Sequence, residues 1–420
     1  LVLIVSLYSR VNLHPDEFSH IKAGLFYQDH WFKLAVAHPD MLKTMIPGWG
    51  SSYLFLNDIV YSAAEKFTAV LEPLGVENHL RYRLFNFALL PILLLIFISD
   101  RRNGIWFLLA IGLSTQTWYL FSYFNGDALG MFSTMLLAFI YAKHSEDIDK
   151  IFWEKAGISA IALAFYSLCV LVLFTRLHYA IFVAFLLGLI RVSNLHGKPF
   201  SAWLGAASRI SLFLTLLAIP VGLAELKDQA ANNFELDSAI ARVGDIHKKP
   251  DFKFEHILKT GENLHNLYLR ELGEPYLSLF TEHRWLQRSW PSFFGVYGFM
   301  NIRAPWSFYV ISSLAGMGLI LAYLLFSVPS ANKRFKAALA FFFVMAILTV
   351  VQSTLYSWTQ GVQAQGRYLL AIIPMLAVIL ALNPHKRQIP DLTVHSYLLA
   401  VYAINVTGFA LYGVIPMVDS

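Results

Sequence analysis

The residues best suited to chemistry lie close together near the start of the chain. The segment from Asn12 to Gly24 reads NLHPDEFSHIKAG, so two adjacent carboxylates, Asp16 and Glu17, follow a proline and an apolar run. Proline is favoured in the first turn of a helix, where the helix dipole also stabilises acidic residues. His20 would then lie one turn further along the same face. This spacing predicts a preassembled cluster of acids and a histidine at a helix N-terminus.

Two adjacent carboxylates can divide the work of a group-transfer reaction. One can accept the proton of an attacking hydroxyl, an effect of about 10² to 10⁴-fold, while the other holds the acceptor. Arginine is suited to bind a leaving phosphate group, because its planar guanidinium binds phosphate through two hydrogen bonds and stays charged when half buried. Arg367, in the sequence QGRY, is the first choice for this role, and the weaker choices are Arg81, Arg83, Lys22 and Arg176.

The apolar runs of the chain hold almost no ionisable residues, since Arg209 and Lys336 lie near run ends and no carboxylate falls at mid-membrane. An ion-coupled transporter needs such groups near the midplane. Polar residues instead follow the runs, which suits a reaction at the membrane interface on a substrate with a lipid tail. We predict Asp16 and Glu17 as catalytic residues, and as substrate-binding residues His20, Lys22, Asp127, Arg176, Gln365 and Arg367.

Simpler roles compete with these predictions. Adjacent acids commonly cap a helix N-terminus, Asp127 in the turn sequence NGD can merely begin a helix, and Arg367 can anchor a helix at the lipid headgroups. DEFSH holds half of the HExxH zinc pattern but lacks its first histidine, which argues against a zinc protease. A divalent cation bridging Asp16 or Glu17 and a phosphate stays open, because hard cations prefer carboxylates. The sequence itself requires no cofactor.

Composition excludes an ordinary soluble protein. Of 420 residues, 57% are hydrophobic and 14% charged, with a mean hydropathy of +0.55. Such values indicate an all-α polytopic membrane protein. The single cysteine, Cys169, lies in an apolar run, so neither an intramolecular disulfide nor a thiolate metal site is supported. The net charge of +5 comes without a basic tract or zinc-finger spacing, which argues against nucleic acid as a partner.

Apolar runs approach the length needed to cross about 30 Å of hydrocarbon. Residues 1–8 form about half a span and begin without a methionine, so we expect a first helix that has lost its beginning. With it, about eleven transmembrane helices are predicted. The ten other runs are 84–99, 105–124, 128–142, 156–174, 179–190, 203–224, 306–328, 335–355, 368–383 and 394–417.

The distribution of Lys and Arg predicts the orientation of these spans. Alternating them places five loops with twelve Lys and Arg on one side, whereas the short loops opposite hold only Arg176 and Arg367. The positive-inside rule makes the first side cytoplasmic. Asp16, Glu17 and two long segments, 9–83 and 225–305, then face outward.

The two long segments differ in character. In 9–83, residues 18–32 and 53–70 interleave aromatic and charged residues, which predicts juxtamembrane helices lying along the interface. The alternative for 53–70 is another transmembrane helix, with charges at mid-span that cost about 2.5 to 3.5 kcal/mol each. Segment 225–305 is polar and then aromatic, and we expect it to form a cap on a single transmembrane catalytic domain, 1–420.

Four motifs carry a resemblance to a known family. PDEFSH (Pro15 to His20) resembles the Asp-Glu motif of the type-C (GT-C) glycosyltransferase superfamily, whose multi-spanning members use polyprenyl-phosphate-linked sugars. NGDAL (125–129), SFFGVYG (292–298) and QGRYLLAIIP (365–374) are similar to a bacterial branch of that superfamily. Two positions depart from its pattern, with Phe294 in place of tryptophan and Ala371 in place of proline.

The resemblance implies an inverting glycosyltransferase with a GT-C-like fold, in a bacterial inner membrane with the active site on the periplasmic or extracellular side. Asp16, by its position in the motif, would deprotonate the acceptor hydroxyl, which attacks the anomeric carbon and expels lipid phosphate. Glu17 would assist or bind sugar hydroxyls, and Arg367 would neutralise the phosphate. The implied partners are a polyprenyl-phosphate-linked sugar donor, a cell-envelope glycan or lipid acceptor, and membrane lipids.

Two other classes of function compete with this reading. A flippase or transporter of lipid-linked saccharides should carry polar residues through the depth of the membrane. A non-catalytic membrane scaffold would keep the fold without needing the carboxylates. Substitution of Asp16 and of Arg367 would distinguish an enzyme from these two alternatives.

Overall fold

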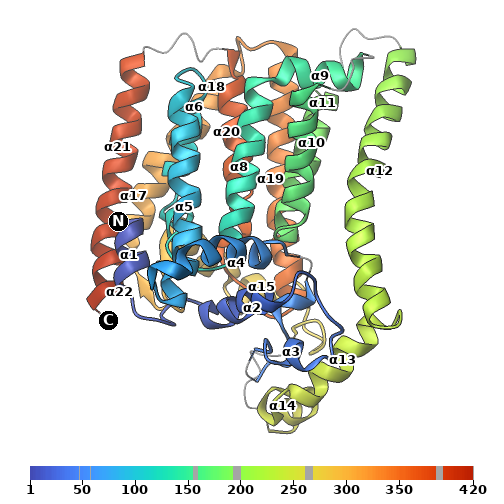
Figure 1. Cartoon of the computed structure of the whole chain (residues 1–420). Coiled ribbons are helices and arrows are strands. Elements are labelled where there is room, and N and C mark those ends of the chain that lie inside the picture. The colour runs from blue at the N-terminus through green and yellow to red at the C-terminus, as the bar shows by residue number, and fades with distance from the viewer. Residues whose placement is uncertain are drawn as a thin grey trace.

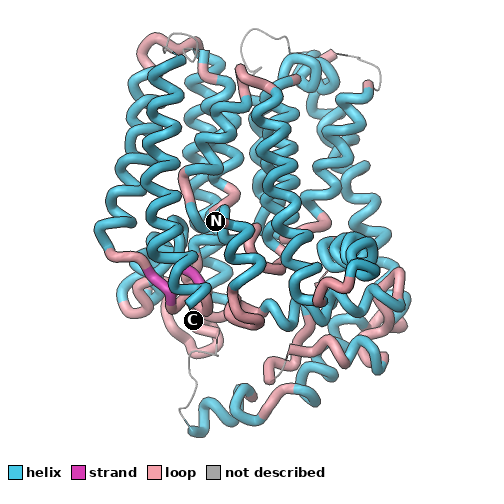
Figure 2. The backbone as a smooth tube through the Cα atoms, turned by 60° about the vertical axis from the view of Figure 1, so that its left-hand side comes forward, coloured by secondary structure: helices cyan, strands magenta, loops and turns pink. Residues whose placement is uncertain are grey.

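The computed structural model describes residues 1–46, 48–56, 58–154, 159–192, 200–260, 268–384 and 391–419. Within these ranges the chain is helical, apart from loops and a hairpin of two short antiparallel strands, β1 (Val296–Tyr297) and β2 (Ile302–Arg303), with Val296 opposite Arg303. The hairpin lies near the C-terminal end of the chain (Figure 2). Figure 1 shows a bundle of roughly parallel helices with shorter helices gathered at one end.

Five helical stretches are long and apolar enough to cross a membrane, so the chain is an all-α membrane protein. The predicted count of eleven spans stays a prediction. These stretches comprise α5 (Asn78–Ser99), α12 (Phe200–Ala231), α17 (Trp306–Ser312) continued by η6 (Ser313–Gly318) and α18 (Leu319–Ser327), α19 (Lys333–Thr359), and α21 (Asp391–Phe409) continued by η9 (Ala410–Val414) and α22 (Ile415–Asp419).

Shorter apolar helices complete the bundle. They are α1 (Val2–Tyr8), α6 (Gly104–Gly112), α7 (Thr115–Leu120), α8 (Asp127–Lys143), α10 (Ala160–Leu173), η3 (Leu177–Tyr179) with α11 (Ala180–Val192), and η7 (Gly366–Leu369) with α20 (Ile372–Leu382). The core lies where α20 packs against both α6 and α8. Nearly every residue of α20 is buried, which explains why this helix is apolar on all sides.

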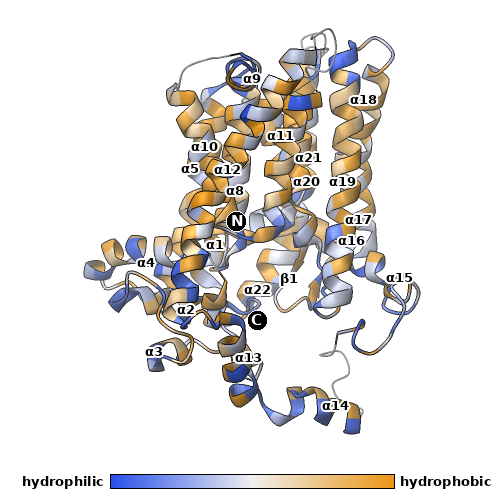
Figure 3. Ribbon diagram, turned by 90° about the vertical axis from the view of Figure 1, so that its right-hand side faces the viewer, coloured by the Kyte–Doolittle hydropathy of each residue, from blue (hydrophilic) through white to orange (hydrophobic). Residues whose placement is uncertain are grey.

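The predicted loops separate to the two ends of the bundle. At one end, called here the α9 end, lie the loop between α5 and α6, helix α9 (Ser145–Trp153) and the start of α19 (Figure 1). At the other, called the α2 end, lie α2 (Glu17–Asp29), α3 (Pro39–Leu42), η1 (Tyr53–Phe55) and α4 (Val60–Leu71) with η2 (Glu72–Leu74). Apolar residues cover the bundle between these ends, and hydrophilic residues are frequent beyond it (Figure 3).

Helices α2 and α4 lie across the bundle rather than along it, and they pack against each other (Figure 1). Helix α2 begins later than the sequence suggested. Pro15 precedes the helix instead of occupying its first turn, because Asp16 adopts a left-handed conformation with φ of 58° and the helix begins at Glu17.

The second long segment begins inside a helix, since α12 continues unbroken to Ala231. It then forms α13 (Leu236–His247), η4 (Pro250–Phe252), α14 (Phe254–Thr260), α15 (Ser278–Thr281) and α16 (Trp285–Gly295). Lys33 pairs with Asp228, and the Val36 amide donates to Asn232 Oδ1 at 2.8 Å. The two long segments therefore contact each other at the α2 end.

Candidate functional site

Asp16 precedes α2, but its carboxylate does not cap that helix. The side chain accepts no hydrogen bond from the first-turn amides, and its Oδ2 instead accepts one from the Tyr53 hydroxyl at 2.8 Å. Aspartate is among the few residues that tolerate the left-handed region, so this conformation is accessible to it. Asp16 is exposed. The simple capping role therefore does not describe Asp16, whose carboxylate points to a tyrosine from another segment.

Glu17 faces the opposite way, into the protein. Its side chain is fully buried and pairs with Arg83 on α5, with Nε to Oε1 at 2.6 Å and Nη2 to Oε2 at 2.7 Å. Arg83 also donates to the backbone carbonyls of Ser6, Ser9 and Arg10. A buried pair of this kind is costly to break from one side, by about 3 to 5 kcal/mol. The pair fixes the segment that leads to Asp16.

His20 is linked to Asp16 through Tyr53 and not by a direct contact. Its Nδ1 lies 2.8 Å from the Tyr61 hydroxyl, and its ring stacks on the Tyr53 ring with centroids 3.9 Å apart. Burial, together with the charges of Arg176 and Arg367, holds the pKa of His20 well below its usual value, so the ring is neutral. Lys22 is not part of this arrangement, because its Nζ lies over the Phe18 ring at 4.6 Å.

A second group of charges, called here the Asp127 cluster, consists of Asp127, Asp58, Arg176, His178 and Arg367. Asp127 Oδ1 lies 3.9 Å from Arg176 Nε and 3.7 Å from His178 Nε2, while Oδ2 lies 3.7 Å from Arg367 Nη1. The cluster thus joins the first turn of α8, the loop before α11 and the loop before α20. Segments about 240 residues apart meet around one carboxylate.

The NGD turn positions Asp127 and makes room for an arginine. Asn125 Oδ1 accepts from the amides of Asp127 at 2.9 Å and Ala128 at 3.1 Å, which begins α8. A Cβ at Gly126 would lie 2.4 Å from Arg176 Nε. Glycine at this position therefore lets the guanidinium approach the turn.

Asp58 supplies a second carboxylate to Arg176. Its Oδ2 lies 3.3 Å from Arg176 Nε, and Arg176 Nη2 donates to the Tyr61 hydroxyl at 3.1 Å. Burial raises the pKa of Asp58 to about 6, although Arg176 and the Val60 amide oppose the shift. Asp58 is therefore the carboxyl group of the cluster that can gain a proton near neutral pH.

The Asp127 cluster leaves several buried polar atoms without a hydrogen bond. Among the described residues, these atoms include Arg176 Nε, Arg367 Nε, His178 Nε2 and Asp58 Oδ2, whose ion-pair neighbours lie in unsuitable directions or too far away. Buried polar groups are normally hydrogen-bonded, so the unsatisfied donors on two guanidinium groups are available to a ligand. Guanidinium groups match the oxygens of a phosphate or carboxylate, which makes the cluster a candidate anion site.

Two of the four sequence motifs meet at the loop that carries Arg367. The Gly366 amide donates to Ser292 Oγ at 2.9 Å, and a Cβ at Gly366 would lie 2.0 Å from the Phe293 nitrogen. Main-chain contact with α16 therefore fixes this loop. Gln365 is not in the cluster, because its Nε2 donates to Gln363 Oε1 at 2.8 Å.

Tyr53 connects the two groups of charges. Its hydroxyl binds Asp16, and the Arg176 Cζ lies over its ring at 5.2 Å from the centroid. Of the residues predicted from the sequence, Asp16, His20, Asp127, Arg176 and Arg367 are thus brought together, whereas Lys22 and Gln365 bind neighbours and Glu17 turns inward.

The sequence reasoning did not assign site roles to Tyr53, Asp58, Tyr61 and His178. Tyr53, Asp58 and Tyr61 fall in the segment 53–70, where mixed aromatic and charged residues were interpreted only as an interface helix. A signal was available for His178, which lies two residues after Arg176 at the same helix end.

A cation at Asp16 has no ready-made set of ligands in the part of the chain that the structure describes. The group of three potential ligands found there is Glu274, Glu282 and His283, whose ligand atoms lie within 4.8 Å of one another. That group includes neither Asp16 nor Glu17, and His283 Nε2 already lies 2.8 Å from Glu274 Oε2.

Compared with known proteins, the chain matches no family model and no curated sequence.

Proposed function

We propose that this protein is an inverting glycosyltransferase of the GT-C type, which moves a sugar from a polyprenyl-phosphate donor to a hydroxyl group of a cell-envelope glycan or lipid. The observation that supports the proposal is the convergence of Asp16 with Arg176, Arg367 and Asp127 around Tyr53. A carboxylate that could accept a proton thus contacts the Tyr53 hydroxyl, and a candidate anion site contacts the ring of the same residue. A transfer from lipid phosphate to a hydroxyl needs both.

In the proposed reaction, the acceptor oxygen forms a bond to the anomeric carbon as the bond from that carbon to the phosphate oxygen breaks. Asp16 takes the acceptor proton, and the leaving phosphate keeps the electron pair of the broken bond. The exposed carboxylate of Asp16 is open to an incoming acceptor, and Tyr53 orients it through one hydrogen bond. Glu17 acts as a positioning residue, because both of its oxygens are held by Arg83.

The Asp127 cluster would stabilise the charge that develops on the phosphate. The unsatisfied Nε atoms of Arg176 and Arg367 provide donors for phosphate oxygens. In the absence of donor, Asp127 and Asp58 balance the two arginines, so their charges stay compensated when the site is empty. Donor binding would then exchange part of this ion pairing for contacts with phosphate.

The proposal places the reaction outside the cytoplasm of a bacterial cell. Of the five loops rich in Lys and Arg, the described residues 100–104, 143–154 and 332–336 lie at the α9 end, whereas 193–198 and 385–388 lie outside the described residues. The positive-inside rule assigns the α9 end to the cytoplasm. The α2 end, with Asp16 and the Asp127 cluster, would then face the periplasm or the exterior. Partners there would be the lipid-linked donor and the envelope acceptor.

Separate substitution of Asp16 and Arg367 in the purified protein tests the proposal. Asp16→Asn keeps a residue that tolerates a left-handed backbone, and Asp29→Asn, at the far end of the same helix, is the matched control. We expect Asp16→Asn to slow the release of lipid phosphate by about 10² to 10⁴-fold while donor binding survives. We expect Arg367→Gln to weaken donor binding as well.

The assay follows the release of polyprenyl phosphate from a panel of polyprenyl-phosphate sugars with a hydroxyl acceptor. Full turnover in both variants would end the assignment to a glycosyltransferase. Transport of intact donor across a vesicle membrane, without release of phosphate, would favour a flippase instead.

A further inference from the structure

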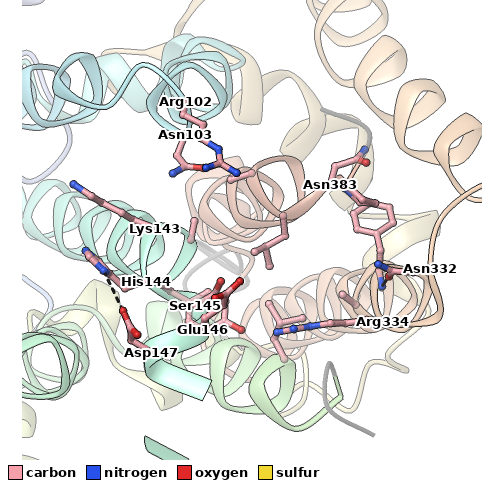
Figure 4. Close-up of a pocket in the computed structure, with 18 residues that line it drawn as sticks. Arg102, Asn103, Lys143, His144, Ser145, Glu146, Asp147, Asn332, Arg334 and Asn383 are labelled. Carbon is pink, nitrogen blue, oxygen red and sulfur yellow. Dashed lines mark hydrogen bonds and ion pairs between the residues drawn. The ribbon is translucent and has the colours of Figure 1, made fainter. Parts of the chain in front are cut away.

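A pocket of about 580 Å³ opens at the α9 end, far from the Asp127 cluster (Figure 4). Five parts of the chain enclose it: the loop between α5 and α6, the junction of α8 and α9, Leu189 of α11, the start of α19 and the end of α20. Figure 4 shows Arg102 on one side of the pocket, Lys143 and Ser145 on a second and Arg334 on a third. Nothing in the proposed glycosyl transfer uses this pocket.

Three helices begin at this pocket, although α9 carries the acids Glu146 and Asp147 in its own first turn. Asn103, His144 and Asn332 line it, and these residues immediately precede α6, α9 and α19. A helix N-terminus carries roughly half a positive charge on its unpaired amides. The starts of α6 and α9 have no side-chain cap, whereas Asn332 Oδ1 accepts from the Phe335 amide at 2.8 Å. The helix dipoles therefore add to the charges of the basic side chains.

The basic side chains of the pocket outnumber its acids. Arg102, Lys143 and Arg334 line it together with Glu146 and Asp147. Asp147 is already near two partners, His144 at 3.8 Å and Lys150 at 3.7 Å. Arg334 likewise pairs with Asp149. Arg102 and Lys143 then remain as positive side chains against Glu146, and together with the helix starts they favour an anion.

The remaining lining suits a ligand with hydroxyl groups. The amide side chains of Asn103, Asn332 and Asn383 each make a hydrogen bond within the protein, which fixes these polar groups at the pocket wall. The Glu146 carboxylate can accept hydrogen bonds from hydroxyl groups. The floor is apolar and includes Phe335. A ligand that fits this lining has a negative group, at least one hydroxyl and a small carbon skeleton.

We propose that this pocket binds a phosphate ester with a hydroxylated alcohol, of the glycerophosphate class. Arg102 and Arg334 contact the phosphate, and Glu146 accepts a hydrogen bond from a hydroxyl group. The same chemistry occurs in the headgroup of an anionic phospholipid and in a free sugar or glycerol phosphate. This site is independent of the glycosyl transfer proposed for the α2 end.

Binding measurements on the full chain in phosphatidylcholine nanodiscs test the site. The two probes are phosphatidylglycerol incorporated in the discs, followed by native mass spectrometry, and soluble sn-glycerol 3-phosphate, followed by calorimetry. Binding of phosphatidylglycerol alone identifies a lipid headgroup site, and binding of both probes identifies a site for the free ester. Retention of phosphatidylglycerol no greater than that of phosphatidylcholine, together with no binding of glycerol phosphate, would overturn the proposal.

Paired variants distinguish the pocket from general surface charge. We expect Arg102→Gln to weaken binding by about tenfold or more, because it removes a charged hydrogen-bond donor. Arg101→Gln, in the same loop but outside the pocket lining, should leave affinity within about twofold. Equal losses in these two variants would reduce the site to nonspecific attraction and contradict the proposal.

Arg334 needs its own control because its Nη2 pairs with Asp149. Arg334→Gln should weaken binding as Arg102→Gln does, whereas Asp149→Asn removes the pair and keeps the guanidinium. Retained binding in Asp149→Asn supports direct contact with Arg334. Loss of binding in Asp149→Asn equal to that in Arg334→Gln would show that Arg334 acts only through that pair, which contradicts the contact proposed for it.

Discussion

The two ends of the bundle both hold arginines, but they hold them in different environments. At the α2 end, the side chains of Arg176 and Arg367 are 15% and 16% exposed and share Asp127. At the α9 end, the side chain of Arg334 is 46% exposed, and Arg102 is exposed as well. Charges interact strongly where water is excluded and weakly where it is not. The first environment suits chemistry, and the second suits reversible binding.

The same helices connect the two ends. Helix α8 has Asp127 as its first residue and Lys143 as its last, about 24 Å apart at 1.5 Å per residue. Helix α20 follows Arg367 at one end and leads to Asn383 at the other. The ends therefore differ in burial: Tyr53 of η1 and Tyr61 of α4 contact Arg176 at one end, whereas Arg102 and much of the Arg334 side chain are exposed at the other.

The largest expected effect concerns the buried pair behind Asp16. Arg83→Met leaves the fully buried Glu17 without its partner and should lower the free energy of unfolding by about 3 to 5 kcal/mol. Arg334→Met, at the half-exposed pair with Asp149, should cost less than about 1 kcal/mol. Reversible denaturation in mixed micelles measures both. Similar losses at the two arginines would remove the contrast between the ends.

The next effect concerns the loop that holds Arg367. Gly366→Ala puts a methyl group against the Phe293 backbone and should destabilise the protein by about 1 to 3 kcal/mol, while also lowering donor affinity. The matched control is Gly222→Ala in α12, where a Cβ meets nothing within 4 Å and should stabilise the helix by about 0.5 to 1 kcal/mol. Unchanged donor affinity in Gly366→Ala would show that this loop does not position the anion site.

A smaller effect is expected at the tyrosine between the two groups of charges. Tyr53→Phe removes the hydroxyl that donates a hydrogen bond to Asp16 but keeps the ring under Arg176. Turnover should therefore fall by about tenfold, while binding of the lipid-linked sugar is retained. Tyr8→Phe, which changes an exposed hydroxyl, is the control. If Tyr53→Phe lost binding of the lipid-linked sugar but kept turnover, Tyr53 would act through Arg176 alone and not through Asp16.

The smallest effect is a dependence on pH. The pKa of Asp58 is about 6 in the folded protein and near 3.8 when unfolded, so between these values the folded state binds more protons. The contribution of Asp58 to stability is therefore fully present below about pH 4 and is lost as the pH rises through 6. Asp58→Asn should remove this contribution, as seen in thermal unfolding from pH 4 to 7.

Protonation of Asp58 should also strengthen the binding of an anion at the Asp127 cluster. Below pH 6, Asp58 is neutral and Arg176 is less compensated, so a phosphodiester donor, which does not itself titrate there, should bind severalfold more tightly. Donor affinity that does not vary between pH 5 and 7 in the parent protein would contradict this prediction.

Much of this architecture follows from patterns in the sequence. The membrane class follows from hydropathy, because apolar helices must be long and nearly free of charge. The meeting of Asp127, Arg176 and Arg367 follows from a simple geometric rule: residues at the same ends of neighbouring spans lie at one level. Asp16 joined them in the prediction because its motif follows the first apolar run.

The remaining features depend on contacts that no local pattern records. Arg83 was a weak candidate for phosphate, yet it pairs with Glu17, 66 residues away, because α1 and α5 pack side by side. The left-handed backbone of Asp16 and its hydrogen bond from Tyr53, 37 residues away, are indicated by no local pattern. The pocket at the α9 end combines loops that were interpreted only as carriers of positive charge.

The contact of Gly366 with the Ser292 and Phe293 backbone has a consequence for substrates of different length. Two stretches of main chain touch there, so the backbone that carries Arg367 cannot shift along the bundle without moving α16. Isoprenoid carriers that differ in their number of units would all have to present their heads at one fixed level. Tolerance of longer tails would then arise among the surrounding acyl chains and not within the protein.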